Sequence, residues 1–220
     1  ISTNYGDAFA RVIYTESHDE VANGSARVPA EIDPGDQSGW AAQKRSTLGA
    51  ALVLTSPGIP MLFQGQEFLE GAWFRDNVPL DWARDGHFQG IANLYRDLIN
   101  LRLNRAQQTR GLTGQGLNVY HANDDDNLIV FHRFADGGPG DDTIVVVNLS
   151  NEAQSDLTIG LPRPGLWKLR FNSDAAAYSA LFGDFDSFDA EGFEGEVDGQ
   201  AWHGTVSIAP YSALVYSQDA

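Results

Sequence analysis

The pattern of apolar residues changes near Arg110, and this change predicts a chain built from two kinds of structure. Before it, two compact apolar runs at residues 11–15 and 60–64 alternate with longer runs at residues 39–54 and 88–103. The longer runs repeat apolar residues at helical spacing, whereas the compact runs have the length of strands. This part therefore reads strand, helix, strand, helix, with enough residues between the strands for a parallel crossover.

Beyond Arg110 the helical runs disappear, and short strand-like runs separated by turn residues take their place. A series of this kind is typical of an antiparallel β-sandwich. The acidic, glycine-rich segment 184–198 is expected to be a solvated loop, and the wider segment 172–204 carries no motif that assigns it a role. The expected strands lie at residues 117–121, 128–134, 143–148, 156–159, 166–171, 205–208 and 213–217.

Charge and cysteine content exclude several classes of function. Thirty acidic and 14 basic residues give a net charge of -16, which argues against binding to nucleic acid or to an anionic membrane surface. A neutral polysaccharide is compatible with this charge, although solubility or a salty habitat explains it equally well. The absence of cysteine rules out disulfides and thiolate chemistry, and it favours a cytoplasmic protein. No signal peptide or apolar run of about 18 residues is present. Because the chain begins at Ile1 and not at Met, it is expected to lack its natural beginning.

His18 and Asp19 stand directly after the first expected strand. In parallel α/β architectures the loops at the C-terminal ends of strands converge on one mouth, where function concentrates. A carboxylate accepts hydrogen bonds and an imidazole can donate them, so the pair suits the recognition of sugar hydroxyls. A His-Asp pair that only forms a turn or cap is the structural alternative. The local residues leave both interpretations open.

Three segments of the chain resemble the α-amylase family. Residues 14–19, YTESHD, resemble the family's fourth signature region at the end of the seventh barrel strand, and residues 58–68, GIPMLFQGQEF, resemble its eighth strand. Residues 208–215, IAPYSALV, resemble the end of the family's C-terminal β-domain. The resemblance implies a fold class of α/β plus all-β. Residues 1–109 would be the last strands and helices of a (β/α)8 barrel, and residues 110–220 a C-terminal antiparallel β-sandwich.

The resemblance also implies roles for individual residues. Asp19 would be the carboxylate that stabilises the transition state, and His18 would bind hydroxyls of the reacting sugar. Gln66 and Glu67, at the end of the second motif, are candidate substrate-binding residues. The family is a retaining one, whose nucleophilic Asp and acid/base Glu lie on barrel strands four and five. Both are expected to precede Ile1, so the chain would hold one of three catalytic carboxylates, would need the remainder of its barrel, and would be inactive alone.

Within the family, residues 17–21, SHDEV, together with residues 63–68, FQGQEF, look closest to glycogen-branching enzymes. These enzymes cleave an α-1,4-glucan and transfer the chain to form an α-1,6 link. Trp73 and Trp82, in the loop after the second motif, either stack on glucose rings or pack beneath the loop.

Two alternatives stay open at this point. One is an α-glucan hydrolase of the α-amylase type, in which water is the acceptor. The other is a noncatalytic glucan-binding or structural module. No cofactor is predicted, because the chain lacks a nucleotide-binding or phosphate-binding glycine loop, and no metal site is predicted, because its histidines are scattered without ligand spacing.

Overall fold

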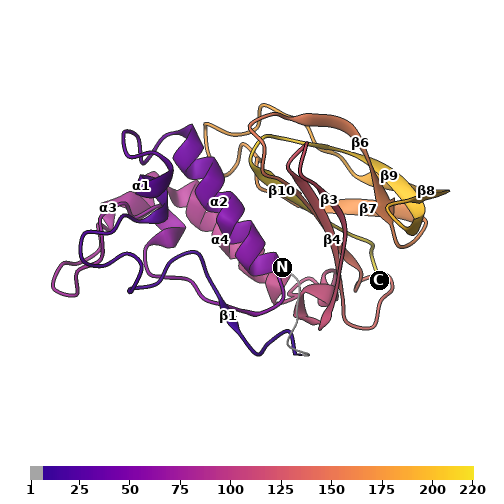
Figure 1. Ribbon diagram of the computed structural model, residues 1–220, viewed down its shortest axis with the longest axis horizontal. Coiled ribbons are helices and arrows are strands. Elements are labelled where there is room, and N and C mark those ends of the chain that lie inside the picture. The colour runs from indigo at the N-terminus through magenta and orange to yellow at the C-terminus, as the bar shows by residue number, and fades with distance from the viewer. Residues whose placement is uncertain (1–6) are drawn as a thin grey trace.

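The computed structural model describes residues 7–220, so that Ile1 lies outside the described residues. Helices and a pair of short strands occupy one end of the molecule, and a large sheet occupies the other (Figure 1). We call residues 7–109 the helical half and residues 116–217 the β-domain. The helical half contains β1 (Val12–Ile13), α1 (Val28–Ile32), α2 (Trp40–Thr55), β2 (Ile59–Pro60), a 3-10 helix (Gln66–Phe68), α3 (Ala83–His87) and α4 (Gln89–Arg102).

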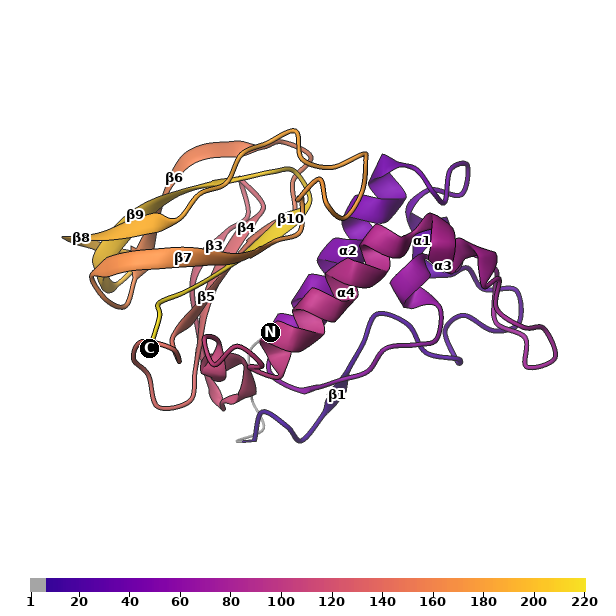
Figure 2. The ribbon, with the colours of Figure 1, turned by 180° about the vertical axis from the view of Figure 1, so that it is seen from behind.

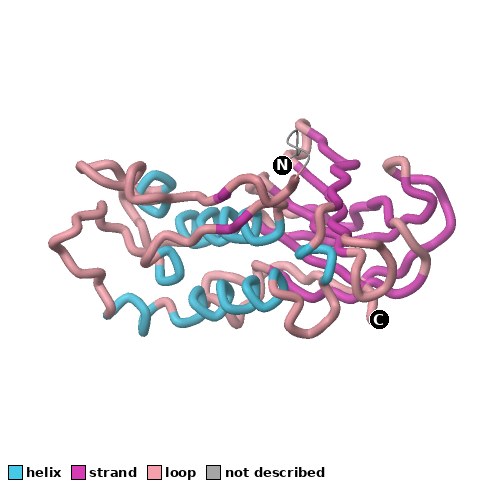
Figure 3. The backbone as a smooth tube through the Cα atoms, turned by 90° about the horizontal axis from the view of Figure 1, so that it is seen from below, coloured by secondary structure: helices cyan, strands magenta, loops and turns pink. Residues whose placement is uncertain are grey.

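β1 and β2 form a parallel pair, in which Val12 lies opposite Ile59 and Ile13 opposite Pro60. The backbone N–H of Ile59 donates to the Arg11 carbonyl at 2.9 Å. The long helix α2 makes the crossover between the two strands. Figure 3 shows them as short neighbouring segments beside α2 and apart from the large sheet. The predicted order of strand, helix and parallel strand is therefore confirmed.

Helix α4 buries the predicted apolar stripe. Its inward side chains pack with those of α2 into one core, and this core continues onto a face of the β-domain. The spacing of the stripe at three and four residues places it on a single helical face. No helix within residues 7–220 is long and apolar enough to cross a membrane. The buried residues of the stripe are Ile91, Leu94, Tyr95 and Leu98.

The β-domain is one antiparallel sheet with the strand order β3-β4-β5-β10-β7-β8-β9-β6. It follows a 3-10 helix (Arg110–Thr113). Each of the expected strands is present, which confirms the antiparallel all-β prediction. The strands are β3 (Gly116–Asn123), β4 (Leu128–Phe134), β5 (Thr143–Asn148), β6 (Gln154–Leu161), β7 (Gly165–Asn172), β8 (Ala190–Val197), β9 (Gln200–Ile208) and β10 (Ser212–Ser217).

Strand β8 corrects the expectation that residues 184–198 form a solvated loop. It pairs with β7 and β9, and its acidic side chains Glu191 and Glu194 are exposed. Gly192 lies so close to the turn before β7 that an added Cβ would stand 2.8 Å from the Arg163 carbonyl oxygen. Glycine in this strand thus permits close backbone approach.

The sheet folds over, and its two ends meet in a sandwich-like arrangement (Figure 2). A second apolar core lies inside the fold, where β4, β5 and β10 face β6 and β9 around the fully buried Trp167. The Tyr120 hydroxyl of β3 donates to the Gly160 carbonyl of β6 at 2.8 Å. This bond joins the two edge strands of the sheet, where unpaired backbone groups are otherwise exposed.

Buried polar contacts join the two halves in addition to the shared core. Lys44 Nζ of α2 lies 2.6 Å from Asp174 Oδ1 in the loop after β7, and both side chains are buried. Burial lowers the pKa of Lys44, and the Asp174 carboxylate opposes that shift. Arg133 of β4 donates to the Thr55 carbonyl at the end of α2 at 2.6 Å. Burial, together with the charge of Arg102, lowers the pKa of Arg133 to about 9. A domain boundary at residues 109 and 110 stays a prediction.

A charged cluster in the β-domain predicts a pH-dependent stability. The buried Asp142 carboxylate contacts His132 Nε2 at 2.9 Å and Arg163 Nε at 2.6 Å. Burial alone raises the pKa of Asp142, but these hydrogen bonds outweigh it, and the pKa lies below its ordinary value of 3.8. Stability from this group is therefore present above the unfolded pKa and lost as pH falls through the folded one.

Asp142→Asn should accordingly be less stable than the original chain at neutral pH. The gap should close below both pKa values, where the carboxyl is protonated in either state. Urea unfolding of both proteins across this pH range measures the difference. An unchanged gap at all pH values would mean that charge at Asp142 contributes nothing.

Candidate functional site

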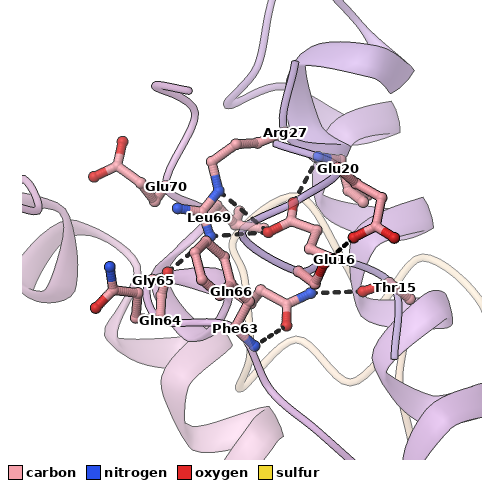
Figure 4. Close-up of polar contacts among 12 residues, drawn as sticks. Thr15, Glu16, Glu20, Arg27, Phe63, Gln64, Gly65, Gln66, Leu69 and Glu70 are labelled. Carbon is pink, nitrogen blue, oxygen red and sulfur yellow. Dashed lines mark hydrogen bonds and ion pairs between the residues drawn. The ribbon is translucent and has the colours of Figure 1, made fainter. Parts of the chain in front are cut away.

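Two loops meet beyond the C-terminal ends of the parallel strands (Figure 4). We call residues 14–22 the β1 loop and residues 61–69 the β2 loop. Gln66 connects them, since its Nε2 donates to Thr15 Oγ1 at 2.5 Å and its Oε1 accepts from the Phe63 backbone N–H at 2.7 Å. Both polar ends of the buried Gln66 side chain are thus engaged within the protein. A direct contact of Gln66 with substrate stays a prediction.

His18 and Asp19 are presented to solvent by the β1 loop. Their side chains are 67% and 82% exposed, and His18 Nε2 lies 3.2 Å from Asp19 Oδ1. The loop turns locally, because the Asp19 backbone N–H donates to Ser17 Oγ at 3.2 Å while the Ser17 hydroxyl donates to the Glu20 carboxylate. The pair is therefore both part of a turn and open to a ligand. Its chemical groups can accept and donate hydrogen bonds to hydroxyls.

Beneath this exposed pair lies a buried ion pair between Glu16 and Arg27. Glu16 Oε2 accepts from Arg27 Nε at 3.1 Å and from Arg27 Nη2 at 2.8 Å. The other oxygen, Oε1, accepts from the Val28 backbone N–H at 2.6 Å, at the beginning of α1. Pro29 stands in the first turn of this helix, a position that needs no N–H donor. Glu16 thus receives three hydrogen bonds and holds the β1 loop against α1.

A second buried carboxylate, Glu70, holds the loop that follows. Its Oε1 accepts from the Ala72 backbone N–H and its Oε2 from the Asp81 backbone N–H, both at 3.0 Å. Burial raises the pKa of Glu70. The two backbone donors lower it, as do the charges of Arg27 and Arg84, and the net pKa lies below its ordinary value. Ionised Glu70 therefore fixes both ends of the segment between Ala72 and Asp81.

The remaining candidate residues are arranged around these loops. Glu67 accepts a hydrogen bond from the Gly65 backbone N–H at 3.0 Å and lines a cavity of about 430 Å³ between the β2 loop and α4. Trp82 is 65% exposed, although its ring centroid lies 5.4 Å from that of Phe68. Trp73 is partly exposed and lies under the Arg75 guanidinium at 5.0 Å. Both tryptophans thus combine a packing contact with a partly exposed side chain.

The structure brings His18 and Asp19 together directly. Among residues 7–220, no hydrogen bond or ion pair joins Glu67, Trp73 or Trp82 to this pair. The segment that carries Trp73 does reach the β1 loop, because the neighbouring Phe74 N–H donates to the Val21 carbonyl at 2.7 Å. Within the same described residues, no group of three or more His, Cys, Asp or Glu side chains forms a candidate metal site.

Sequence reasoning missed Glu16, Arg27 and Glu70. Each is a charged residue in a loop without periodic pattern, where a charge normally indicates a solvated surface. The one usable signal is the position of Arg27, just before Val28 and Pro29 at a helix start. Nothing in the sequence shows that this arginine meets a carboxylate in the β1 loop.

Solved structures share the fold of this chain. Pullulanase complexed with maltotetraose from Anoxybacillus sp. LM18-11 has a TM-score of 0.65 and 19% identity, with 97% of this chain and 28% of that chain covered. Alpha-amylase from H. orenii has a TM-score of 0.59 and 16% identity, with 94% and 40% covered. These matches confirm the predicted fold class, and they extend over the helical half as well as the β-domain.

Sequence comparison finds a matching family in the β-domain and similar enzymes over most of the chain. Residues 119–219 match the family described as alpha amylase, C-terminal all-beta domain. The 1,4-alpha-glucan branching enzyme GlgB of Mycobacterium ulcerans (strain Agy99) is 30% identical over 214 residues, covering 93% of this chain and 28% of that protein. The enzyme of the same name from Paramagnetospirillum magneticum (strain ATCC 700264 / AMB-1) is 32% identical over 165 residues, covering 74% and 22%.

Residues 119–219 therefore match the C-terminal all-beta domain of alpha amylases, and over most of its length the chain is similar to enzymes named GlgB. It spans 28% of the length of the Mycobacterium ulcerans relative.

Proposed function

We propose that this chain is the C-terminal part of a retaining α-glucan-active enzyme that forms α-1,6 branches. The observation that carries the proposal is the exposed His18–Asp19 pair, held at the end of a parallel strand by the buried Glu16 carboxylate. The relationship to proteins named 1,4-alpha-glucan branching enzyme supports the choice of reaction.

In the proposed reaction an α-1,4 bond of the glucan breaks and a glycosyl-enzyme forms, after which a sugar hydroxyl accepts the chain. The resemblance assigns the nucleophile and the acid/base to residues outside the matched motifs of this chain. The part left to Asp19 is electrostatic, because a fixed carboxylate stabilises the positive charge that develops on the reacting sugar. His18 contributes a hydrogen bond to a hydroxyl of the same sugar.

The open parallel pair supports the proposal that the remainder of a barrel packs here. Val12 and Ile59 lie opposite each other and are 51% and 49% exposed. Tyr14, which follows β1, is also exposed. A two-stranded parallel pair is not stable as an open sheet, since parallel sheets are covered on both faces. We propose further parallel strands on its edges.

Product analysis of the whole enzyme that contains this chain tests the reaction. With a linear α-1,4-glucan as substrate, α-1,6 linkages should form while the number of reducing ends stays constant, because each broken bond is replaced by a new one. Proton NMR of the anomeric region and a reducing-end assay measure the two quantities. Rising reducing ends without α-1,6 linkages would identify a hydrolase instead.

The chain alone should show no glucan-cleaving or glucan-transferring activity. The proposed mechanism needs two further carboxylates, and the resemblance gives this chain only Asp19. A purified preparation of residues 1–220 with the same glucan and the same assays measures this. Turnover by a preparation free of other glucan-active enzymes would contradict the assignment of roles.

A further inference from the structure

We infer that Arg27 is the positioning residue of the candidate site, holding the β1 loop, the β2 loop and residues 70–82 in register. The inference rests on the proposed function, because the loops it connects carry the proposed catalytic and glucan-binding residues. Arg27 is one of the largest fully buried side chains in the described part of the chain. Neither the resemblance to the α-amylase family nor the proposed reaction assigns a role to Arg27.

The first connection runs to the β1 loop. Arg27 uses two donors, Nε and Nη2, on the same carboxylate oxygen of Glu16. Glu16 stands three positions before Asp19 in the sequence, and it is 1% exposed. The two charge-assisted donors fix the position of that oxygen, and the Val28 N–H on the other oxygen sets the orientation of the carboxylate. The backbone that leads into His18 and Asp19 therefore begins at a fixed point.

The second connection runs to the β2 loop. Arg27 Nη2 also donates to the Gln64 backbone carbonyl at 2.7 Å. The guanidinium lies over the Phe63 ring, 5.0 Å from its centroid. Figure 4 shows Arg27 between Glu16 on one side and the segment with Gln64 and Gly65 on the other. One guanidinium thus connects both strand-end loops, in parallel with the Gln66–Thr15 bond.

The third connection is electrostatic and runs to Glu70. The Arg27 charge is one of the causes that hold the pKa of Glu70 below its ordinary value. Arg27 and Glu70 also line the same small cavity, together with Trp73. The Arg27 charge favours the ionised form of Glu70, and ionised Glu70 accepts hydrogen bonds from the Ala72 and Asp81 backbone N–H groups. Arg27 therefore stabilises the loop that carries the tryptophans.

Lysine cannot replace arginine in this arrangement. A planar guanidinium can bind a carboxylate with two donors, meet a carbonyl and lie on an aromatic ring at once, whereas an ammonium is a point charge on a flexible stem. Arg27→Lys should therefore keep the charge balance of the buried cluster and lose the fixed geometry. This separates positioning from charge.

The test uses the whole enzyme that contains this chain, with a linear α-1,4-glucan as substrate. Arg27→Lys should lower kcat by about 10-fold to 100-fold, the range that displacement of a reacting group produces, with a smaller change in KM. The double variant Asp19→Asn/Arg27→Lys should have nearly the kcat of Asp19→Asn alone, because Arg27 acts through the loop that holds Asp19. Arg110→Met, which removes an exposed ion pair with Asp136, is the control and should leave kcat unchanged.

Additive losses in the double variant, or a normal kcat in Arg27→Lys with intact folding, would overturn the inference. If Arg27→Lys fails to fold, Glu16→Gln replaces it, because the amide keeps the shape and loses the charge. The same non-additive result with Asp19→Asn is then required. If the unsubstituted enzyme lacks transferase activity, the proposed function is refuted and the positioning inference is not reached. The failure of the inference and the failure of the proposed function are therefore distinguishable.

Discussion

Replacing Asp19 by Asn in the enzyme that contains this chain should lower kcat by at least about 100-fold, equivalent to roughly 2.7 kcal/mol of transition-state stabilisation. The substitution keeps the shape of the side chain and removes its charge. Only the charged transition state needs that charge, so the loss should fall on the chemical step more than on substrate binding. Folding should hardly change, because the Asp19 side chain is 82% exposed.

Asp126→Asn is the matched control for this prediction. Asp126 is exposed in the turn between β3 and β4, where its carboxylate accepts from Asn123 Nδ2 at 2.8 Å. A solvated charge in the β-domain should leave kcat within about twofold. Near-normal turnover of the Asp19 variant would show that the His18–Asp19 pair is only a turn. Loss of activity together with a lowered melting temperature would lead to the same conclusion.

Replacing Asp174 by Asn should destabilise the folded chain by about 3–5 kcal/mol, the usual effect of removing one partner of a buried ion pair. Lys44 then loses the counter-charge of Asp174, while the Phe182 ring, 5.0 Å from its ammonium, carries no charge. Burial already lowers the pKa of Lys44, and Asp174 is the group that opposes it. Urea unfolding of the chain measures the change.

Two further variants sharpen this test. The double variant Lys44→Met/Asp174→Leu removes both charges, and it should be more stable than Asp174→Asn because no buried charge is left unpaired. Asp219→Asn breaks an exposed contact with Arg170 and Lys168, and it should leave the urea midpoint nearly unchanged. Equal midpoints for Asp174→Asn and Asp219→Asn would mean that the contact across the two halves carries no stability.

The helices and most strands are predictable from the sequence for a simple physical reason. The stripe on α4 repeats at helical spacing because the helix buries a single face. β5, which is buried along its whole length, reads as a continuous apolar run. Each pattern reflects burial. Buried side chains are mostly apolar, so their spacing along the chain can be recognised in the sequence.

Strand β8 and the buried charges lack this signature. β8 presents glutamates to solvent and glycines to its neighbours, a composition that is also typical of loops. Arg27, Glu16 and Glu70 are buried because they satisfy one another and nearby backbone groups. Residue type alone predicts that charged side chains such as these lie at the surface. The positions of His18 and Asp19 could be predicted from the strand that precedes them, whereas the residues that hold them in place could not.

The most direct test of the proposed site is the structure of the full enzyme, as its Asp19→Asn variant, with a linear maltooligosaccharide bound. A glucose residue should lie within hydrogen-bonding distance of His18 and of the side chain at position 19, at the ends of β1 and β2. An oligosaccharide bound on the β-domain, with the ends of these strands empty, would contradict it.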